Sequence, residues 1–488
     1  MEFNHKGVNS MKRLLAILLC LCMLAVLIPA HSAAASVDCD CGEIVHVWID
    51  GFGQALFYDE GTPEESRASK SDTSNLARDV LGLFPGVLRS VVAFSWEPFI
   101  KALSEILLNV MVYYRLDENG VSAAPITSHW ILDPEQDHET NPKYSFRYDF
   151  RMDPFDIAEQ LDDFIETLCA QTGHSKIALT GCSEGAVVAM AYLKEYGSKG
   201  RLDSLLIVNG SWQGLTLVGQ LLTKQFEISG PGLTNYLANE ADDLMIAGMD
   251  LLRTSRLLNF LPGLCGLMMR TLGDPIYANA IMPLFGHMPA IWAFVPDEYY
   301  EGAIQAMLGS DPKYDGLRAR IDRYHYGVMM EIPALLEKAM AGGTKVSVVA
   351  SYGLAPMPFT QDTLYQSDGF VDSAREAGGA TYAPLGQTLP PSGSEYRSPD
   401  GVFDAATCIL PDQTWFIKYN SHSAGCMGEL IDWILHSQAQ PTVWQNPAFP
   451  QYLRRTQDGR AVPLGDGPEP APVENFFEAC RIFVRALG

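Results

Sequence analysis

Residues 176–190 read Lys-Ile-Ala-Leu-Thr-Gly-Cys-Ser-Glu-Gly-Ala-Val-Val-Ala-Met. Residues 176–181 have the apolar character of a buried strand, and residues 184–196 have the pattern of a helix. Between them lies the sequence Gly181-Cys182-Ser183-Glu184-Gly185. A strand that runs through Gly-x-Ser-x-Gly directly into a helix is typical of a nucleophile elbow, whose strained turn exposes the serine above the sheet. We therefore expect Ser183 to be a nucleophile; the alternative is a serine that only occupies a strand–helix turn.

A serine hydroxyl needs a general base, and the base needs an acid that orients it. After a nucleophile elbow these residues follow in the order serine, acid, histidine. The histidines after Ser183 are His287, His325, His422 and His436. We predict that His422 is the base, because it lies between a strand expected at 414–419 and a helix expected at 424–436.

The acid is expected on the loop after a strand at 345–351. Residues 367–372 read Ser-Asp-Gly-Phe-Val-Asp and offer two carboxylates. We predict that Asp368 orients the histidine, because Asp-Gly-x-Val is the sequence expected of an acid loop. Asp372 is the alternative, with a second possible role as the N-cap of a helix at 373–377, and Asp362 is the third candidate.

An oxyanion hole requires two backbone N–H donors. One is expected from Glu184, directly after the nucleophile. The other is expected from Phe52, in the sequence Asp-Gly-Phe-Gly that follows a strand at 44–50. A plain turn at the end of that strand is the alternative.

Short apolar runs alternate with helical patterns along the chain, which predicts an α/β fold with a mostly parallel sheet covered by helices. Further strands are expected at 90–96 and 205–209, and a long helix at 154–173. Residues 214–343 break this rhythm and are rich in Leu, Met, Pro and Gly, as in 257–270. We expect a helical cap here that presents apolar side chains to lipid; apolar residues that only build a core are the alternative.

The expected organisation has five parts. These are a signal peptide at 1–35, a first part of the core at 36–214, a helical cap at 215–343, a second part of the core at 344–437, and a C-terminal extension at 438–488 that packs on the core and ends in a helix at 473–487.

The chain has 488 residues, of which 34 are Lys or Arg and 58 are Asp or Glu, giving a formal net charge of −24. Such an acidic protein repels phosphate backbones and anionic bilayers, which argues against nucleic-acid binding. Any transient contact with a lipid interface would have to be apolar. We expect neither a metal nor a cofactor.

Basic residues, a short apolar run at 14–29 and small residues before position 36 predict a secretory signal cleaved after Ala35. An uncleaved N-terminal anchor is the alternative. Cleavage removes three basic residues and one acidic residue and leaves a secreted chain of net charge −26 without a transmembrane segment. Cys39 and Cys41 then lie near the new terminus, and they lack the Cys-x-x-Cys spacing of zinc and redox sites. We expect a frayed end here; a metal site is the alternative, for which Cys-x-Cys is only a weak signal.

Five segments resemble, in order, the lecithin–cholesterol acyltransferase group of α/β-hydrolases, which includes lysosomal phospholipases. They are 47–56, 148–151 (Tyr-Asp-Phe-Arg), 209–214 (Asn-Gly-Ser-Trp-Gln-Gly), 288–296 (Met-Pro-Ala-Ile-Trp-Ala-Phe-Val-Pro) and 351–358 (Ser-Tyr-Gly-Leu-Ala-Pro-Met-Pro). Asp368 and His422 fall where this family has its acid and base. Two departures are Cys182, where the family has histidine, and Asp50, where it has proline and where an acid at the pocket mouth would repel anionic head groups.

The resemblance implies an α/β-hydrolase fold with a large helical cap, and an acyl-ester substrate, most often a lipid. Trp212 and Trp292 would then contact the substrate or form part of the cap. We expect a secreted serine hydrolase that cleaves or transfers acyl groups through an acyl-enzyme. The alternatives are an esterase that acts on small non-lipid esters and a non-catalytic α/β-hydrolase that binds a ligand.

Overall fold

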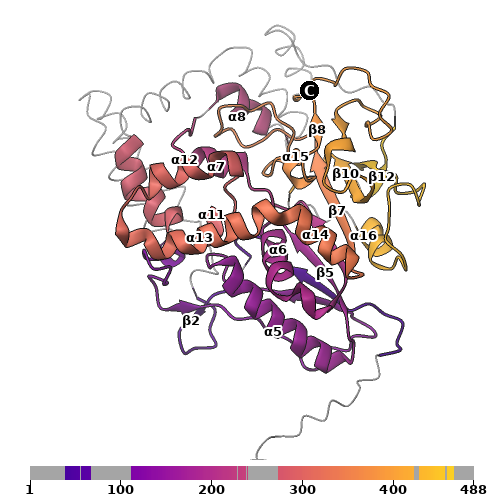
Figure 1. Cartoon of the computed structure of the whole chain (residues 1–488), viewed down its shortest axis with the longest axis horizontal. Coiled ribbons are helices and arrows are strands. Elements are labelled where there is room, and N and C mark those ends of the chain that lie inside the picture. The colour runs from indigo at the N-terminus through magenta and orange to yellow at the C-terminus, as the bar shows by residue number, and fades with distance from the viewer. Residues whose placement is uncertain are drawn as a thin grey trace, which may run out of the picture.

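The computed structural model describes residues 39–54, 56–66, 112–227, 229–237, 239, 273–422, 428–456 and 459–465. These residues form a central eight-stranded sheet flanked by helices (Figure 1). In spatial order its strands are β12 (Ala461–Pro463), β11 (Tyr452–Arg455), β10 (Thr414–Lys418), β7 (Lys345–Tyr352), β6 (Leu202–Val208), β5 (Ile177–Cys182), β1 (His46–Ile49) and β4 (Lys143–Phe146). All neighbouring strands are parallel except the pair β11–β12. The predicted α/β class with a mostly parallel sheet is confirmed.

Helices lie on both faces of the sheet. The described helices are α5 (Pro154–Thr172), α6 (Glu184–Tyr196), α7 (Thr216–Leu222), α8 (Gly230–Leu237), α11 (Pro289–Trp292), α12 (Asp297–Met307), α13 (Asp315–Gly327), α14 (Ile332–Ala341), α15 (Ser373–Glu376) and α16 (Gly428–Leu435), with a π-helix at Tyr277–Gly286. Two-stranded sheets pair β2 (Tyr58–Asp59) with β3 (Ile126–Thr127), and β8 (Thr381–Tyr382) with β9 (Phe403–Asp404).

The strands are buried on both faces, which explains their continuous apolar runs. On one face, side chains such as Val47, Leu179 and Leu205 pack in a large core with α5, α6 and α14. On the other face, side chains such as Ala178 and Leu206 pack with α16. Alternate residues of one strand therefore stabilise two different helical layers.

The long helix α5 has clear start and stop signals. Proline stands at its first position, and the side chain of Asp153 accepts a hydrogen bond from the Phe155 N–H, 2.9 Å away. Gly173 ends the helix in the left-handed conformation, with φ 74°, which is the usual C-terminal role of glycine. The helix ends one residue earlier than the predicted 154–173 range.

The described part of the predicted insertion at 215–343 consists of helices joined by turns and short irregular segments. We predicted that its last helix, α14, is part of the cap. Instead, α14 packs on α6 and β7 and so belongs to the layer that covers the sheet. The helices before it lie beside that layer (Figure 1). The Phe294 carbonyl accepts a hydrogen bond from the Leu215 N–H, 2.8 Å away, which ties the insertion to the chain just after β6.

Three strands of the central sheet were missed by the prediction, as were the four short strands of the two small sheets. β4 has only four residues, and β11 and β12 lie in the C-terminal extension, where they widen the sheet instead of merely covering it. Several predicted segments lie outside the described residues: the signal at 1–35, the strand at 90–96, the stretch 257–270 and the helix at 473–487. Among the helices that the structure describes, none combines the length and the apolar character needed to cross a bilayer.

Two glycines let β1, β5 and α6 approach closely around Ser183. A Cβ atom on Gly185 would lie 2.5 Å from the carbonyl oxygen of Ile49, and a Cβ on Gly181 would lie 2.7 Å from the carbonyl oxygen of Gly185. Both neighbours are backbone atoms that cannot turn aside. The glycines of Gly-x-Ser-x-Gly are therefore required by the packing of the strand and helix backbones.

This packing predicts that Gly185→Ala destabilises the fold. The added methyl group must push α6 away from β1, and overpacking of this kind costs about 1–3 kcal/mol. The free energy of unfolding, measured by denaturant titration, should fall by that amount.

Gly316→Ala is the matched control, because Gly316 is also the second residue of a helix, α13, but a Cβ there meets nothing within 4 Å. It should leave stability unchanged or raise it by up to about 1 kcal/mol, since alanine favours helix over glycine. Equal unfolding free energies for the two variants would contradict the packing argument.

Candidate active site

Ser183 lies at the turn between β5 and α6 in a strained conformation. Its φ is 54° and its ψ is −120°, far outside the regions that residues with a side chain usually adopt. The residue is 7% exposed and is the N-cap position of α6. Strain of this kind is held in place by the surrounding structure and is characteristic of a nucleophile elbow.

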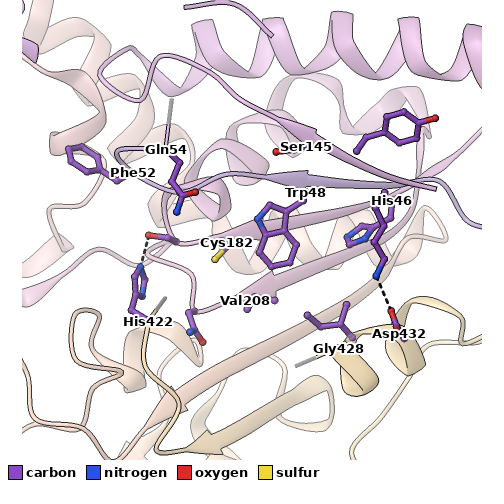
Figure 2. Close-up of a pocket in the computed structure, with 16 residues that line it drawn as sticks. His46, Trp48, Phe52, Gln54, Ser145, Cys182, Val208, His422, Gly428 and Asp432 are labelled. Atoms are coloured by element: carbon purple, nitrogen blue, oxygen red, sulfur yellow. Dashed lines mark hydrogen bonds and ion pairs between the residues drawn. The ribbon is translucent and has the colours of Figure 1, made fainter. Parts of the chain in front are cut away.

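His422 and Asp368 complete a hydrogen-bonded chain with Ser183. The Nε2 atom of His422 lies 2.9 Å from the Oγ atom of Ser183, and its Nδ1 atom lies 2.5 Å from Oδ2 of Asp368. The backbone N–H of His422 also donates to the carbonyl oxygen of Asp368 across 2.9 Å. Figure 2 shows His422 below the turn, joined to the serine by a dashed line. The structure thus brings together the three side chains that the sequence assigned as nucleophile, base and acid.

The loop 368–371 fixes the direction of the Asp368 carboxylate. Its Oδ1 accepts hydrogen bonds from the N–H groups of Phe370 at 2.8 Å and of Val371 at 2.7 Å, which leaves Oδ2 for the histidine. Gly369 has φ 95°, where a side chain would be strained, and Val371 is fully buried. These contacts give the physical reason for the Asp-Gly-x-Val sequence.

The alternative acids serve other purposes. Asp372 stands directly before α15, as expected for an N-cap, but its side chain accepts no hydrogen bond from that helix. Its Oδ2 accepts instead a hydrogen bond from the Thr216 N–H, 3.0 Å away, at the start of α7. Asp362 accepts a hydrogen bond from the Leu364 N–H within its own turn.

The charges of the acid and the base stabilise each other. Burial alone would raise the pKa of Asp368, but the positive charge of His422 and its hydrogen bond hold that pKa below its ordinary value. Burial alone would lower the pKa of His422, but the Asp368 carboxylate raises it above the ordinary 6.5. The pair can therefore hold a proton on the imidazole while the carboxylate remains charged.

Glu376 is a buried neighbour of this pair that the sequence did not reveal. Its carboxylate oxygen and the ligand atoms of Asp368 and His422 lie within 4.8 Å of one another, and the residue is fully buried. Burial and the negative charge of Asp368 raise the pKa of Glu376 far above its usual range. Its Oε2 accepts a hydrogen bond from the Ser351 N–H at 2.7 Å. Glu376 is thus bound to the end of β7 and lies beside the acid and the base.

The loop expected to form the oxyanion hole lies against the nucleophile. A Cβ on Gly51 would meet Cβ of Ser183 at 3.0 Å and its Oγ at 3.4 Å, so a side chain here would press on the nucleophile. The next residue, Phe52, packs its ring edge-to-face on Phe150 and Phe294, with ring centroids 4.4 and 6.2 Å away.

The second expected donor, the Glu184 N–H, belongs to the first residue of α6, where helix N–H groups lack partners within the helix. Its side chain is 1% exposed, and burial, followed by the charge of Asp149, raises its pKa far above the usual range. Asp50, which precedes Gly51, accepts a hydrogen bond from Nε of Arg147, 3.1 Å away. This ion pair partly compensates the negative charge of Asp50.

A pocket of 620 Å³ opens beside Ser183 and His422. Figure 2 shows Trp48 and Val208 on its wall, with Asp432 at the end away from His422. Asp432 forms an ion pair with Lys143, 3.7 Å long. Cys182 also lines it, and burial raises the pKa of that thiol to about 12. The thiol is therefore protonated and does not compete with Ser183 as a nucleophile.

The two tryptophans expected at the substrate lie elsewhere. Trp212 is 1% exposed and donates from Nε1 to the Glu376 carbonyl oxygen at 3.0 Å. Trp292 is 1% exposed and donates to the Gly286 carbonyl oxygen at 2.9 Å. Neither lines the described pocket. Large side chains with a satisfied N–H pack well inside a core. Trp292 lies in α11, within the predicted insertion, as one of the two expectations for it required.

The other histidines after Ser183 have structural contacts. His287 Nδ1 lies 3.0 Å from the Leu116 carbonyl oxygen, and His325 stacks on Tyr300 with ring centroids 3.6 Å apart. His436 follows α16, and its Nδ1 contacts the Asp432 carbonyl oxygen at 2.7 Å, as expected for a histidine at a helix C-terminus.

Comparisons with known proteins give little beyond this geometry. No protein-family model matches the chain, and no curated protein matches it. Among solved structures, a chain in the crystal structure of the Tle4–Tli4 complex is similar, with 12% sequence identity and a TM-score of 0.27 over 63% of this chain and 74% of that chain. A likeness of this size carries no functional argument, so the function has to be argued from the residues of this chain.

The geometry predicts how the reactivity of Ser183 depends on pH. A fluorophosphonate reacts when the serine oxygen attacks phosphorus and fluoride leaves, and neutral His422 must accept the hydroxyl proton. Because Asp368 raises the pKa of His422, labelling should increase with pH and reach half its maximum above pH 6.5. The labelling rate, measured from about pH 5 to about pH 9, checks this.

Ser183→Ala should abolish labelling, and Asp368→Asn should shift the midpoint to lower pH because the imidazolium loses its partner. A rate that does not change over this range would show that His422 is not the base. Labelling that persists in Ser183→Ala would show that another residue is the nucleophile.

Proposed function

We propose that this protein is a secreted serine hydrolase with the α/β-hydrolase fold and a helical cap, which cleaves or transfers the acyl groups of lipid esters. The observation that carries the proposal is the chain from Ser183 Oγ through the imidazole of His422 to Asp368, with contacts of 2.9 and 2.5 Å, built on a strained strand–helix turn. A serine in such a chain is activated for attack on an ester carbonyl.

In the proposed reaction, the oxygen of Ser183 attacks the ester carbonyl carbon while His422 takes its proton. Asp368 stabilises the imidazolium, and the N–H groups of Phe52 and Glu184 stabilise the negative oxygen. The C–O bond to the alcohol then breaks, and His422 gives its proton to the leaving alcohol. Water or a second alcohol attacks the acyl-enzyme in the same way and releases an acid or a new ester.

A lipid substrate is supported by the pocket and by the chain's charge. The apolar side chains that line the pocket include Trp48, Val208 and Ile431, which suit an acyl chain. Its volume of 620 Å³ lies in the range of sites that hold a molecule of moderate size. At a net charge of −24, the protein has no general attraction to anionic membranes, so contact with a lipid would be apolar. The resemblance to lecithin–cholesterol acyltransferases and lysosomal phospholipases agrees with this substrate class.

The lipid proposal predicts that catalytic efficiency rises with acyl-chain length. Each CH₂ group buried in the transition state contributes about 0.8 kcal/mol, or about a fourfold gain in kcat/KM, until the pocket is full. A series of p-nitrophenyl esters from acetate upward measures this. A series that peaks at acetate would favour the esterase of small substrates, and absence of turnover with intact Ser183 labelling would exclude these esters as substrates.

The proposal also predicts different effects of substitution at the two acidic positions. Asp368→Asn should lower kcat/KM by about 10⁴, because the imidazolium loses its partner and the histidine tautomer changes. Asp372→Asn should leave kcat/KM nearly unchanged and lower the unfolding free energy by about 1 kcal/mol, because it weakens the cap of α7. Steady-state kinetics and denaturation of both variants make the comparison. A greater loss of activity at Asp372 would reverse the assignment.

A further inference from the structure

Four side chains with metal-binding atoms meet at one point far from Ser183. They are Cys39, Cys41, His138 and His174, and their ligand atoms all lie within 4.8 Å of one another. The cysteines belong to the first described segment, His138 to the loop before β4, and His174 to the turn after α5. Among the described residues, the only other group of this kind consists of Asp368, Glu376 and His422, which the active site already explains.

The distances in this cluster match the edges of a tetrahedral site. Sγ of Cys39 lies 3.4 Å from Nε2 of His138, and Sγ of Cys41 lies 3.5 Å from Nε2 of His174. With Zn–S bonds of about 2.3 Å and Zn–N bonds of about 2.05 Å, a tetrahedral ion separates sulfur and nitrogen by about 3.6 Å. The imidazole rings meet edge-to-face, with centroids 5.1 Å apart, so both rings can direct Nε2 to one point.

The donor set also selects the metal. Two thiolates and two imidazoles in a tetrahedron are typical of Zn²⁺, whereas Ca²⁺ and Mg²⁺ require oxygen ligands. Four protein ligands leave no position for water or substrate, as in structural sites. Both cysteines are free of disulfide bonds in the structure and can act as ligands.

Backbone groups around the cluster form hydrogen bonds with three of its four residues. The Glu43 N–H donates to Sγ of Cys41 across 3.4 Å, which favours a thiolate. The Cys39 N–H donates to the Gly173 carbonyl oxygen at 3.1 Å, next to His174. His174 is 9% exposed, and its Nε2 lies 3.3 Å from the Glu43 carbonyl oxygen, a long contact that a metal–nitrogen bond can replace. The first described segment is thus held against α5, whereas the sequence suggested a frayed end.

We propose that Cys39, Cys41, His138 and His174 bind one Zn²⁺ ion that fixes the start of the mature chain to the body of the protein. This revises the expectation, drawn from the Cys-x-Cys spacing, that the protein has no metal site. The ligands escaped the sequence analysis because 99 residues separate Cys39 from His138 and 133 separate Cys41 from His174.

The position of the site gives it a structural role. β1, β4 and β5 are parallel neighbours, and the cluster lies on the segments that lead into their amino-terminal ends, while Ser183 follows the carboxyl end of β5. The ion would link the three segments before these strands and close two long loops, which reduces the conformational entropy of the unfolded chain. β1 then leads directly to Gly51 beside the nucleophile.

Metal analysis of the exported, processed chain, purified without a polyhistidine tag, tests the proposal. We expect about one zinc ion per chain. Cys39→Ser/Cys41→Ser and, separately, His138→Ala should each lose most of it. Cys408→Ala and His436→Ala are matched controls, because they remove a cysteine and a histidine outside the cluster, and both should keep the zinc. Replacement by Co²⁺ should give the intense visible bands of a tetrahedral thiolate site.

Chelation should lower the Tm of the parent protein but not that of the double cysteine variant. If that variant fails to fold, His138→Ala decides, because this partly exposed side chain lies on a loop. A parent chain without zinc, whether its cysteines are reduced or joined as a Cys39–Cys41 disulfide, would overturn the proposal. Zinc that survives in His138→Ala and in the double variant would also overturn it. The outcome does not depend on whether Ser183 is a nucleophile.

Discussion

The position of Ser183 depends on two backbones that approach more closely than any side chain would permit. α6 reaches the carbonyl oxygen of Ile49 only because Gly185 has no Cβ, and the turn before it closes only because Gly181 has none. With these backbones in contact, Ser183 between them is confined to a narrow range of conformations, which explains its φ of 54°. The strain at the serine is therefore maintained by packing across three elements, since a local turn preference would not sustain it.

The rest of the site extends outward from that turn through buried polar groups. Asp368 is held by backbone N–H groups of its loop. Glu376 accepts from the Ser351 N–H at the end of β7, and the Trp212 N–H donates to the Glu376 carbonyl oxygen. A buried charge is costly unless its surroundings compensate it, and the charge of Asp368 is compensated by the imidazole of His422 and by the N–H groups of the loop.

Sequence patterns correctly predicted those features whose residues are close together in the chain. The elbow was predictable because its strand, glycines and helix are contiguous, and the acid and base because they follow recognisable strands. Glu376 was not predictable, since eight residues separate it from Asp368 with no periodicity that links them. Trp292 was assigned to a surface by resemblance, although an indole whose N–H finds a carbonyl oxygen is satisfied in a core. The metal-ligand cluster requires contacts across more than ninety residues, which only the folded chain reveals.

The short strand β12 has a consequence for how the molecule behaves among its own copies. It pairs antiparallel with β11, and the Leu464 N–H donates inward to the Tyr452 carbonyl oxygen, so the nitrogen of its neighbour Pro463 faces outward. A proline nitrogen has no hydrogen to donate to a further strand, and three residues give a short template. This border of the described sheet is therefore protected against the edge-to-edge association that leads to aggregates.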